Sequence, residues 1–254
     1  MGKTKLTRKE ILGDDPIRAT MIQIVDTFRT RSKTIGLVAV AAVLIGVGIY
    51  FGLQYLAERE MQAQAELTRG MTLFHARIDP AALDDPYGKG PEPLFRNEEA
   101  RYKAALEGFS SLIAEYGSSK PSLIARYYLG LCQLHLGQPE DAVRNLEEVR
   151  SNTRDRTVGY LAKKVLATHY MESGKPGEST VILEGMLEDP QCELPREVLR
   201  VDLARAYLAA GKTDDARNAI RKARDEAGTG VLNSMVSREL DRLEEQIPSR
   251  EPVP

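Results

Sequence analysis

The stretch LGQPEDAVRNL, residues 136–146, decides the fold of this chain, because it holds the end of one helix, a turn and the start of another. Gly137 suits the left-handed conformation that closes a helix C-terminus, and Pro139 suits the first turn of the next helix, where its missing N–H leaves no hydrogen bond unmade. Glu140 and Asp141 place negative charge at the positive end of that helix dipole. The stretch therefore predicts two helices joined by a tight turn.

The same turn recurs at a fixed spacing. Thirty-seven residues separate Gly137 from Gly174, and thirty-seven separate Gly174 from Gly211. Two positions of the second helix follow this step in four copies, one small (Ala105, Ala142, Ser179, Ala216) and one large and apolar (Phe109, Leu146, Leu183, Ile220). Self-similarity with a period of about 20–50 residues indicates a solenoid, in which each hairpin buries its apolar face by stacking on the next.

The repeated positions resemble the signature of the tetratricopeptide (TPR) family. The copy that carries the resemblance best has Ala125, Leu129, Gly130, Leu136, Gly137, Ala142, Leu146 and Val149. The chain departs from the family in having no Trp and in its period of 37, against about 34 in the family. We assign the extra residues to longer loops between repeats, at 117–122, 151–157 and 188–195. The resemblance implies an all-α solenoid of about four helical hairpins.

The first hairpin is split. Its second helix is expected from about Asn97 to Tyr116, and its first helix is expected earlier, where Ala63, Leu67, Gly70, Met71, Phe74 and Ile78 recur at helical spacing. An insertion at 77–96, rich in Pro, Gly and Asp, separates the two. At the other end, Leu232, Met235, Val236, Leu240, Leu243 and Ile247 predict a C-terminal capping helix. The repeat domain is thus expected at 58–248, and a disordered tail at 249–254.

Residues 34–57 form an apolar segment with no charged residue between Lys33 and Glu58. This length matches the roughly 20 apolar residues that a helix needs to cross a bilayer, so we predict a transmembrane helix with lipid as its partner. A cleavable signal peptide is the competing interpretation, but the run is too long and no A-x-A site follows it. Gly48 and Gly52 form a GxxxG pair that would let two such helices pack as a homo-oligomer, although small residues are also common in single spans.

Charge is distributed unevenly about this segment. Residues 1–33 carry eight Lys and Arg against four acidic residues, whereas the remainder carries 27 basic and 33 acidic residues. Retention of Lys and Arg on the cytoplasmic side predicts a cytoplasmic segment at 1–33 and an exported repeat domain. In a Gram-negative host this means a single-pass protein of the inner membrane with a periplasmic C-terminal domain. Residues 14–28 are expected to form an amphipathic helix on the cytoplasmic leaflet, or one docked on a membrane partner.

No motif for catalysis stands out. The tripeptide GKT at 211–213 is no phosphate loop, because Ala206 occupies the position of the required Gly. The three histidines lack metal-ligand spacing, and we favour packing or solvent contact over a shared site of His135 and His169. We therefore predict no enzyme, no metal or cofactor site, and no nucleic-acid partner.

The aspartates of the insertion and the two cysteines have structural interpretations. Asp79, Asp84 and Asp85 of the insertion offer oxygen ligands for a cation, but three acids in a Pro-rich loop are typical of a solvated turn. Cys132 is expected to act as a small apolar residue, and helix stacking should keep it too far from Cys192 for a disulfide.

TPR repeats line a concave surface with their first helices. The resemblance places ten residues of this chain there: Tyr127, Leu131, Leu134, His135, Lys164, Thr168, Met171, Val201, Arg205 and Leu208. This surface is expected to bind a helix or an extended peptide of a partner protein. The alternative at each position is packing on a neighbouring helix.

The whole arrangement is similar to the YfgM-like ancillary subunits of the bacterial Sec translocon. This resemblance implies a non-enzymatic scaffold that binds the translocon and periplasmic chaperones and assists protein export or envelope assembly. Two alternatives stay open. One is a scaffold of another envelope complex, for outer-membrane assembly, division or secretion, and the other is a membrane-bound enzyme with its site in the insertion.

Overall fold

A computed structural model describes residues 21, 32–81, 93–152, 155–226 and 231–247. The chain divides into two compact units, 1–58 and 59–254, which are described separately below. The predicted amphipathic helix at 14–28 lies outside the described residues apart from position 21, and so do Asp84, Asp85 and the predicted tail at 249–254.

Helix α2, Ser32–Phe74, contains the apolar segment and continues into the first repeat without a break. The sequence suggested a span and a separate repeat helix. They are continuous because Glu58, Arg59 and Glu60 favour helix and no Gly or Pro interrupts them. Among the described residues, α2 is the one helix long and apolar enough to cross a membrane. Its apolar side chains in the first unit are exposed, Leu44 and Phe51 at 66% each.

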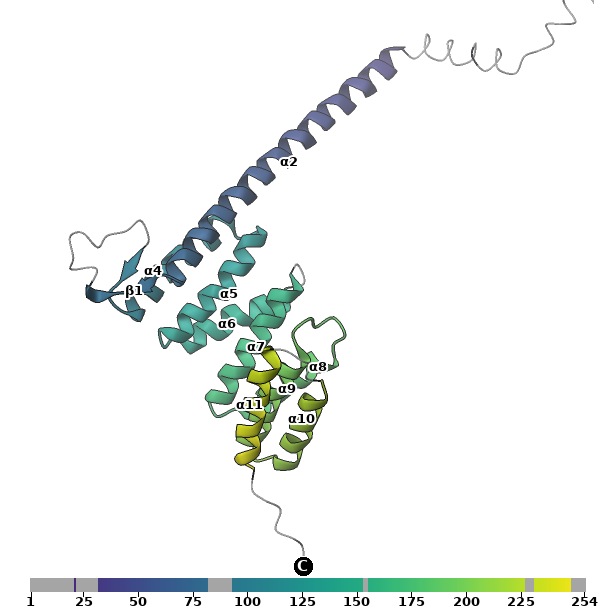
Figure 1. Cartoon of the computed structure of the whole chain (residues 1–254). Helices are drawn as coiled ribbons and strands as arrows, with labels where there is room; N and C mark the ends of the chain where they lie inside the picture. The colour runs from purple at the N-terminus through teal and green to yellow at the C-terminus, as the bar shows by residue number, and fades with distance from the viewer. Residues whose placement is uncertain (1–20, 22–31, 82–92, 153–154, 227–230, 248–254) are drawn as a thin grey trace, which may run out of the picture. The chain divides into compact units, whose positions relative to one another are not determined.

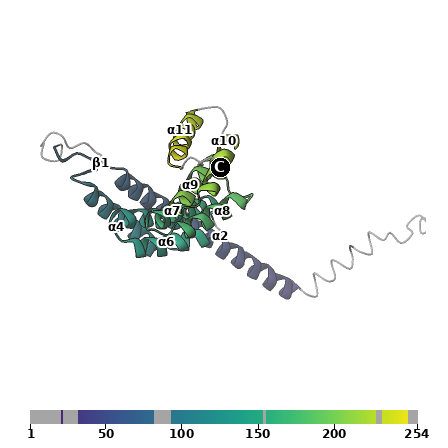
Figure 2. The ribbon, with the colours of Figure 1, turned by 90° about the horizontal axis from the view of Figure 1, so that it is seen from below.

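The second unit is a row of helical hairpins (Figure 1). Its described hairpins pair the end of α2 with α4 (Glu98–Tyr116), α5 (Lys120–His135) with α6 (Pro139–Ser151), α7 (Arg156–Glu172) with α8 (Pro176–Glu188), and α9 (Arg196–Ala209) with α10 (Thr213–Glu226). Helix α11 (Val231–Glu245) follows and packs on α9 and α10, as the turned view in Figure 2 also shows. The predicted helical repeats are therefore confirmed.

The turns inside three hairpins share one geometry. Gly137, Gly174 and Gly211 have φ of 71°, 74° and 72°, and they are the described glycines with positive φ. In each turn the N–H of the following residue donates to a carbonyl five residues earlier, at 2.8 Å, as between Gln138 and Gln133. This closes the first helix in the Schellman manner, and α6 and α8 then start at a proline. The predicted role of these glycines is confirmed.

The insertion in the first hairpin contains a small sheet. Helix α2 ends at Phe74, so the expectation that Ile78 belongs to the helix is wrong. Ile78 lies instead in β1 (Arg77–Ile78), which pairs in parallel with β2 (Leu94–Phe95). Pro80 disfavours helical backbone at Asp79 just before it, which opposes a helix through the end of this segment. The described fold is thus helical with one short strand pair.

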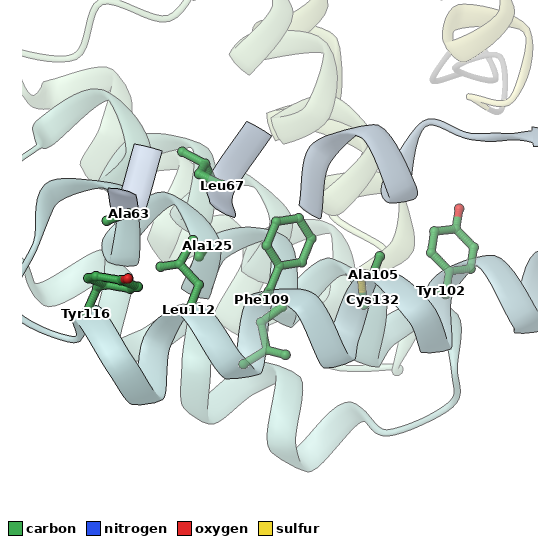
Figure 3. Packing of buried hydrophobic residues seen from close by; sticks show 10 residues of the cluster. Ala63, Leu67, Tyr102, Ala105, Phe109, Leu112, Tyr116, Ala125 and Cys132 are labelled. Carbon is green, nitrogen blue, oxygen red and sulfur yellow. The ribbon is translucent and has the colours of Figure 1, made fainter. Parts of the chain in front are cut away.

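The core of the first hairpin is built on α4. Its buried side chains point in a row toward α2 and α5 (Figure 3): Tyr102, Ala105, Phe109, Leu112 and Tyr116. Phe109 is fully buried, and its ring packs so close to Gly70 of α2 that an added Cβ there would lie 2.5 Å from ring atom Cε1. Gly70 therefore permits the contact between the two halves of the split hairpin.

The C-terminal cap buries one face of α11. Val236, Leu240, Leu243 and Ile247 are buried in a cluster with residues of α9 and α10. Met235, predicted on the same face, is 59% exposed, so that part of the prediction is wrong. Val236 is 6% exposed and takes the buried side, and Met235, about 100° away around the helix, lies toward solvent.

Candidate protein-binding groove

The first helices of the repeats enclose three neighbouring hollows. The Tyr127 hollow, of about 480 Å³, lies between α5 and α7 and is lined by Tyr127, Leu134, Gly137, Pro139, Leu161, Lys164, Val165, Thr168, His169 and Glu172. The Asp202 hollow, of about 260 Å³, is lined by Ala167, Thr168, Met171, Glu172, Ser179, Leu183, Asp202 and Arg205. The Leu208 hollow, of about 380 Å³, is lined by Arg205, Leu208, Ala209, Thr213, Leu243 and Gln246.

These hollows adjoin one another, because neighbours share lining residues, and we refer to the three together as the groove. Thr168 and Glu172 line both the Tyr127 hollow and the Asp202 hollow. Arg205 lines both the Asp202 hollow and the Leu208 hollow. A partner chain lying along the second unit would therefore meet α5, α7, α9 and α11 in turn. A further hollow of about 330 Å³ between α2 and α4 shares no lining residue with this groove.

The structure brings seven of the ten predicted residues into the groove. They are Tyr127, Leu134, Lys164 and Thr168 in the first hollow, with Met171, Arg205 and Leu208 in the others. These side chains come from α5, α7 and α9, which hold the same place in successive hairpins. Each repeat of the sequence therefore adds one first helix to the groove.

Three predicted residues lie elsewhere. Val201 is only 5% exposed and belongs to the apolar cluster that α9 forms with α10 and α11, so it is a core residue. The ring of His135 stacks on Tyr102 of α4, with centroids 4.1 Å apart and planes at 5°. Leu131 is half-buried and lines none of the three hollows. His135 and His169 therefore do not share a site.

The groove also contains residues that the resemblance did not supply. Leu161, Val165 and Glu172 of α7 line the Tyr127 hollow with the predicted Thr168, at spacings of three and four residues. That spacing marks one side of a helix, so the stripe was present in the sequence. Leu243 and Gln246 at the end of the capping helix line the third hollow. No sequence signal placed them there, because their contribution depends on how α11 packs against α9.

An ion-pair network crosses the middle of the groove. Lys164 Nζ lies 2.7 Å from Asp202 Oδ2, and Arg205 Nη1 lies 2.9 Å from Asp202 Oδ1. Arg205 Nη2 also lies 2.8 Å from Glu239 Oε1 of α11. The two cations predicted for the groove are therefore compensated within the chain. The network joins α7, α9 and α11.

The first hollow is mainly apolar. Burial raises the pKa of the Tyr127 phenol above its ordinary value of 10, so an already uncharged phenol holds its proton more firmly. Tyr127 also packs edge-on against Tyr128, with centroids 5.4 Å apart. The outer carbon atoms of Leu134, Leu161 and Val165 complete the walls. Such a hollow suits an apolar side chain better than a charged one.

Elsewhere the described residues offer little chemistry. They hold no group of three His, Cys, Asp or Glu side chains arranged for a metal ion. Asp79 of the insertion lies 3.5 Å from Arg77 in an ion pair. Cys132 and Cys192 are free thiols, and burial raises the pKa of Cys132 to about 12. The absence of enzymatic, metal and cofactor function stays a prediction.

The link between α9 and α11 should depend on pH. The hydrogen bond from Arg205 holds the pKa of Glu239 below its ordinary value of 4.5. Because the pKa of Glu239 is lower in the folded state than in the unfolded state, the link stabilises the folded cap fully when the pH is above the unfolded-state pKa. This stabilisation is lost as the pH falls through the folded-state pKa. We expect Glu239→Gln to lower the midpoint of thermal unfolding at neutral pH, and to flatten its decline between about pH 5 and pH 3. An unchanged slope in the variant would show that Glu239 does not hold the cap.

The family model described as tetratricopeptide repeat-like domain matches residues 32–245. No curated protein matches the chain. Among solved structures, the chain is similar to the nearly identical TPR-like repeats of a putative kinesin light chain from Podosopora anserina, with 21% identity, 59% of this chain and 80% of that chain covered, and a TM-score of 0.48.

Proposed function

The chain belongs to the tetratricopeptide repeat-like family, and from this premise we propose that it is a membrane-anchored scaffold that binds partner proteins in its groove. The row of three hollows along α5, α7 and α9 carries this proposal. The Tyr127 hollow has mainly apolar walls and the other two add polar and charged groups, a combination that suits the side chains of an extended or helical peptide. The proposed function needs no reaction, only binding and positioning.

The anchor is proposed from the first unit. Between Gly36 and Ala57 the described side chains of α2 are exposed and mostly apolar, and no charge interrupts them. Water would make such a surface costly at about 25 cal/mol per Å² of apolar area, whereas lipid removes this cost. The family match starts at residue 32 and so includes this segment, as expected of an anchor that belongs to the mature domain.

The order of the segments and their charges support a more specific location and cellular role. The surplus of Lys and Arg before the span supports a cytoplasmic N-terminus and an exported groove, which is periplasmic in a Gram-negative host. A single span with an exported TPR domain is the arrangement that resembles the YfgM-like Sec ancillary subunits. We therefore propose that the groove serves protein export or envelope assembly, with translocon subunits and periplasmic chaperones as partners. Self-association through Gly48 and Gly52 is a separate proposal on the same helix.

Site-specific crosslinking in native membranes tests this function. Photoreactive residues at Leu134 and Thr168 line the groove without breaking the ion-pair network, and Val181 of α8, 68% exposed, is the matched control outside the groove. We expect protein adducts from the first two positions and few from Val181. Adducts with translocon subunits or chaperones would support the export role, and adducts with another envelope machine would replace it. Equal labelling at all three positions would contradict binding in the groove.

A further inference from the structure

One charged residue of the groove stands apart from the others. Lys164, Asp202, Arg205 and Glu239 compensate one another in the network described above. Glu172, the last residue of α7, is exposed and forms no ion pair with any residue that the structure describes. It lines both the Tyr127 hollow and the Asp202 hollow, so it lies where the two meet. A peptide crossing from one hollow to the other would pass this carboxylate.

The helix termini add little net charge at that place. A helix C-terminus carries roughly half a negative charge and a helix N-terminus roughly half a positive one. Gly137, which closes α5, lines the Tyr127 hollow together with Pro139, the first residue of α6. The negative end of α5 therefore meets the positive end of α6 at this rim, and the carboxylate that lines the hollow is that of Glu172.

The two cations that line the hollows beside Glu172 are paired elsewhere. Lys164 Nζ lies 2.7 Å from Asp202 Oδ2, and Arg205 Nη1 lies 2.9 Å from Asp202 Oδ1. Lys175, three residues after Glu172, is the N-cap of α8 and lines none of the three hollows. Among the described lining residues, Glu172 is therefore the carboxylate left for an incoming cation.

We propose that the groove selects peptides in which a bulky apolar side chain enters the Tyr127 hollow and a nearby Lys or Arg pairs with Glu172. This selection rests on the proposed function, since it assumes that the groove binds peptides at all. Tyr127, Leu134 and Val165 provide the apolar contact, which gives most of the affinity. Glu172 provides charge selection, since a basic side chain is attracted there and an acidic one is repelled.

Matched peptides test the selection with the full chain in detergent. The probes are fluorescent Gly/Ser peptides with one Leu and, two to four positions later, either Lys or Glu. At low ionic strength we expect the Lys peptide to bind about five- to tenfold more tightly than its Glu counterpart, a ratio that salt reduces. Glu172→Gln should remove most of this ratio, and Glu172→Lys should invert it. The control is Glu188→Gln, which removes a carboxylate at the end of α8 outside the groove and should leave the ratio unchanged.

The possible results distinguish a failure of the proposed charge selection from a failure of the proposed peptide binding. If both peptides bind equally and Glu172→Gln changes nothing, while Leu134→Ala weakens both, the groove binds peptides but the proposed selection is wrong. A preference for the Glu peptide would also overturn it. If neither peptide binds at any tested concentration, the groove function and the selection fail together. Thermal unfolding of each variant checks that the fold is retained.

Discussion

Replacing Phe109 by Ala is expected to lower the free energy of unfolding by about 3–5 kcal/mol. Its ring is fully buried between α2, α4 and α5 and stacks near Tyr128, with centroids 5.5 Å apart. Truncation removes this apolar contact and leaves a cavity that the helices cannot close. Whole domains of this kind have about 5–15 kcal/mol of stability, so the loss is a large part of the total. Urea unfolding of the full chain in detergent, followed by circular dichroism, measures it.

Two further variants test whether the loss of stability comes from the contact between Phe109 and Gly70. Gly70→Ala brings a methyl group against the same ring and should cost about 1–3 kcal/mol through overpacking. Val181→Ala, at a side chain that is 68% exposed, should change stability by less than about 0.5 kcal/mol. Because each repeat contacts mainly its neighbours, hydrogen exchange should rise most in α2, α4 and α5. Equal destabilisation by Phe109→Ala and Val181→Ala would contradict the described core.

Placing two lysines in the apolar segment is expected to release the protein from membranes. Leu44 and Val47 lie near the middle of residues 34–57, and each Lys there costs about 2.5–3.5 kcal/mol on an insertion scale. Together the two changes disfavour the inserted state by roughly 5–7 kcal/mol, more than about a thousandfold. Carbonate extraction of cell membranes, with the protein followed in pellet and supernatant, measures the change.

An apolar double variant is the control for this experiment. Leu44→Ile with Val47→Leu keeps the segment apolar and should remain in the pellet like the original chain. If the lysine variant also remains in the pellet, the groove or another surface holds the protein to the membrane, and the anchor is wrong. If the original chain is found in the supernatant and shortened by the length of its first segment, the segment is a cleaved signal.

The sequence by itself determined the repeat. Gly137, Gly174 and Gly211 close their helices with positive φ, and Pro139 and Pro176 start the next ones, as their chemistry requires. Phe109, Leu146, Leu183 and Ile220, one step of 37 residues apart, are each at most 1% exposed. Such features depend on backbone conformation and periodicity, which are local properties of the chain. The seven groove residues followed instead from the resemblance to TPR repeats, which assigns the first helix of each hairpin to the concave surface.

Only the tertiary structure decided which apolar residues face the core and which face the groove. Val201 became a core residue because α11 covers it, and His135 stacks on Tyr102 because α4 lies beside α5. The pairing of Lys164 and Arg205 with Asp202 needs α7 and α9 side by side, and Glu239 joins from a helix 34 residues away in sequence. The physical reason is that a helix in a solenoid has neighbours on several sides. Periodicity shows that a side is apolar, while the packing of those neighbours determines what covers it.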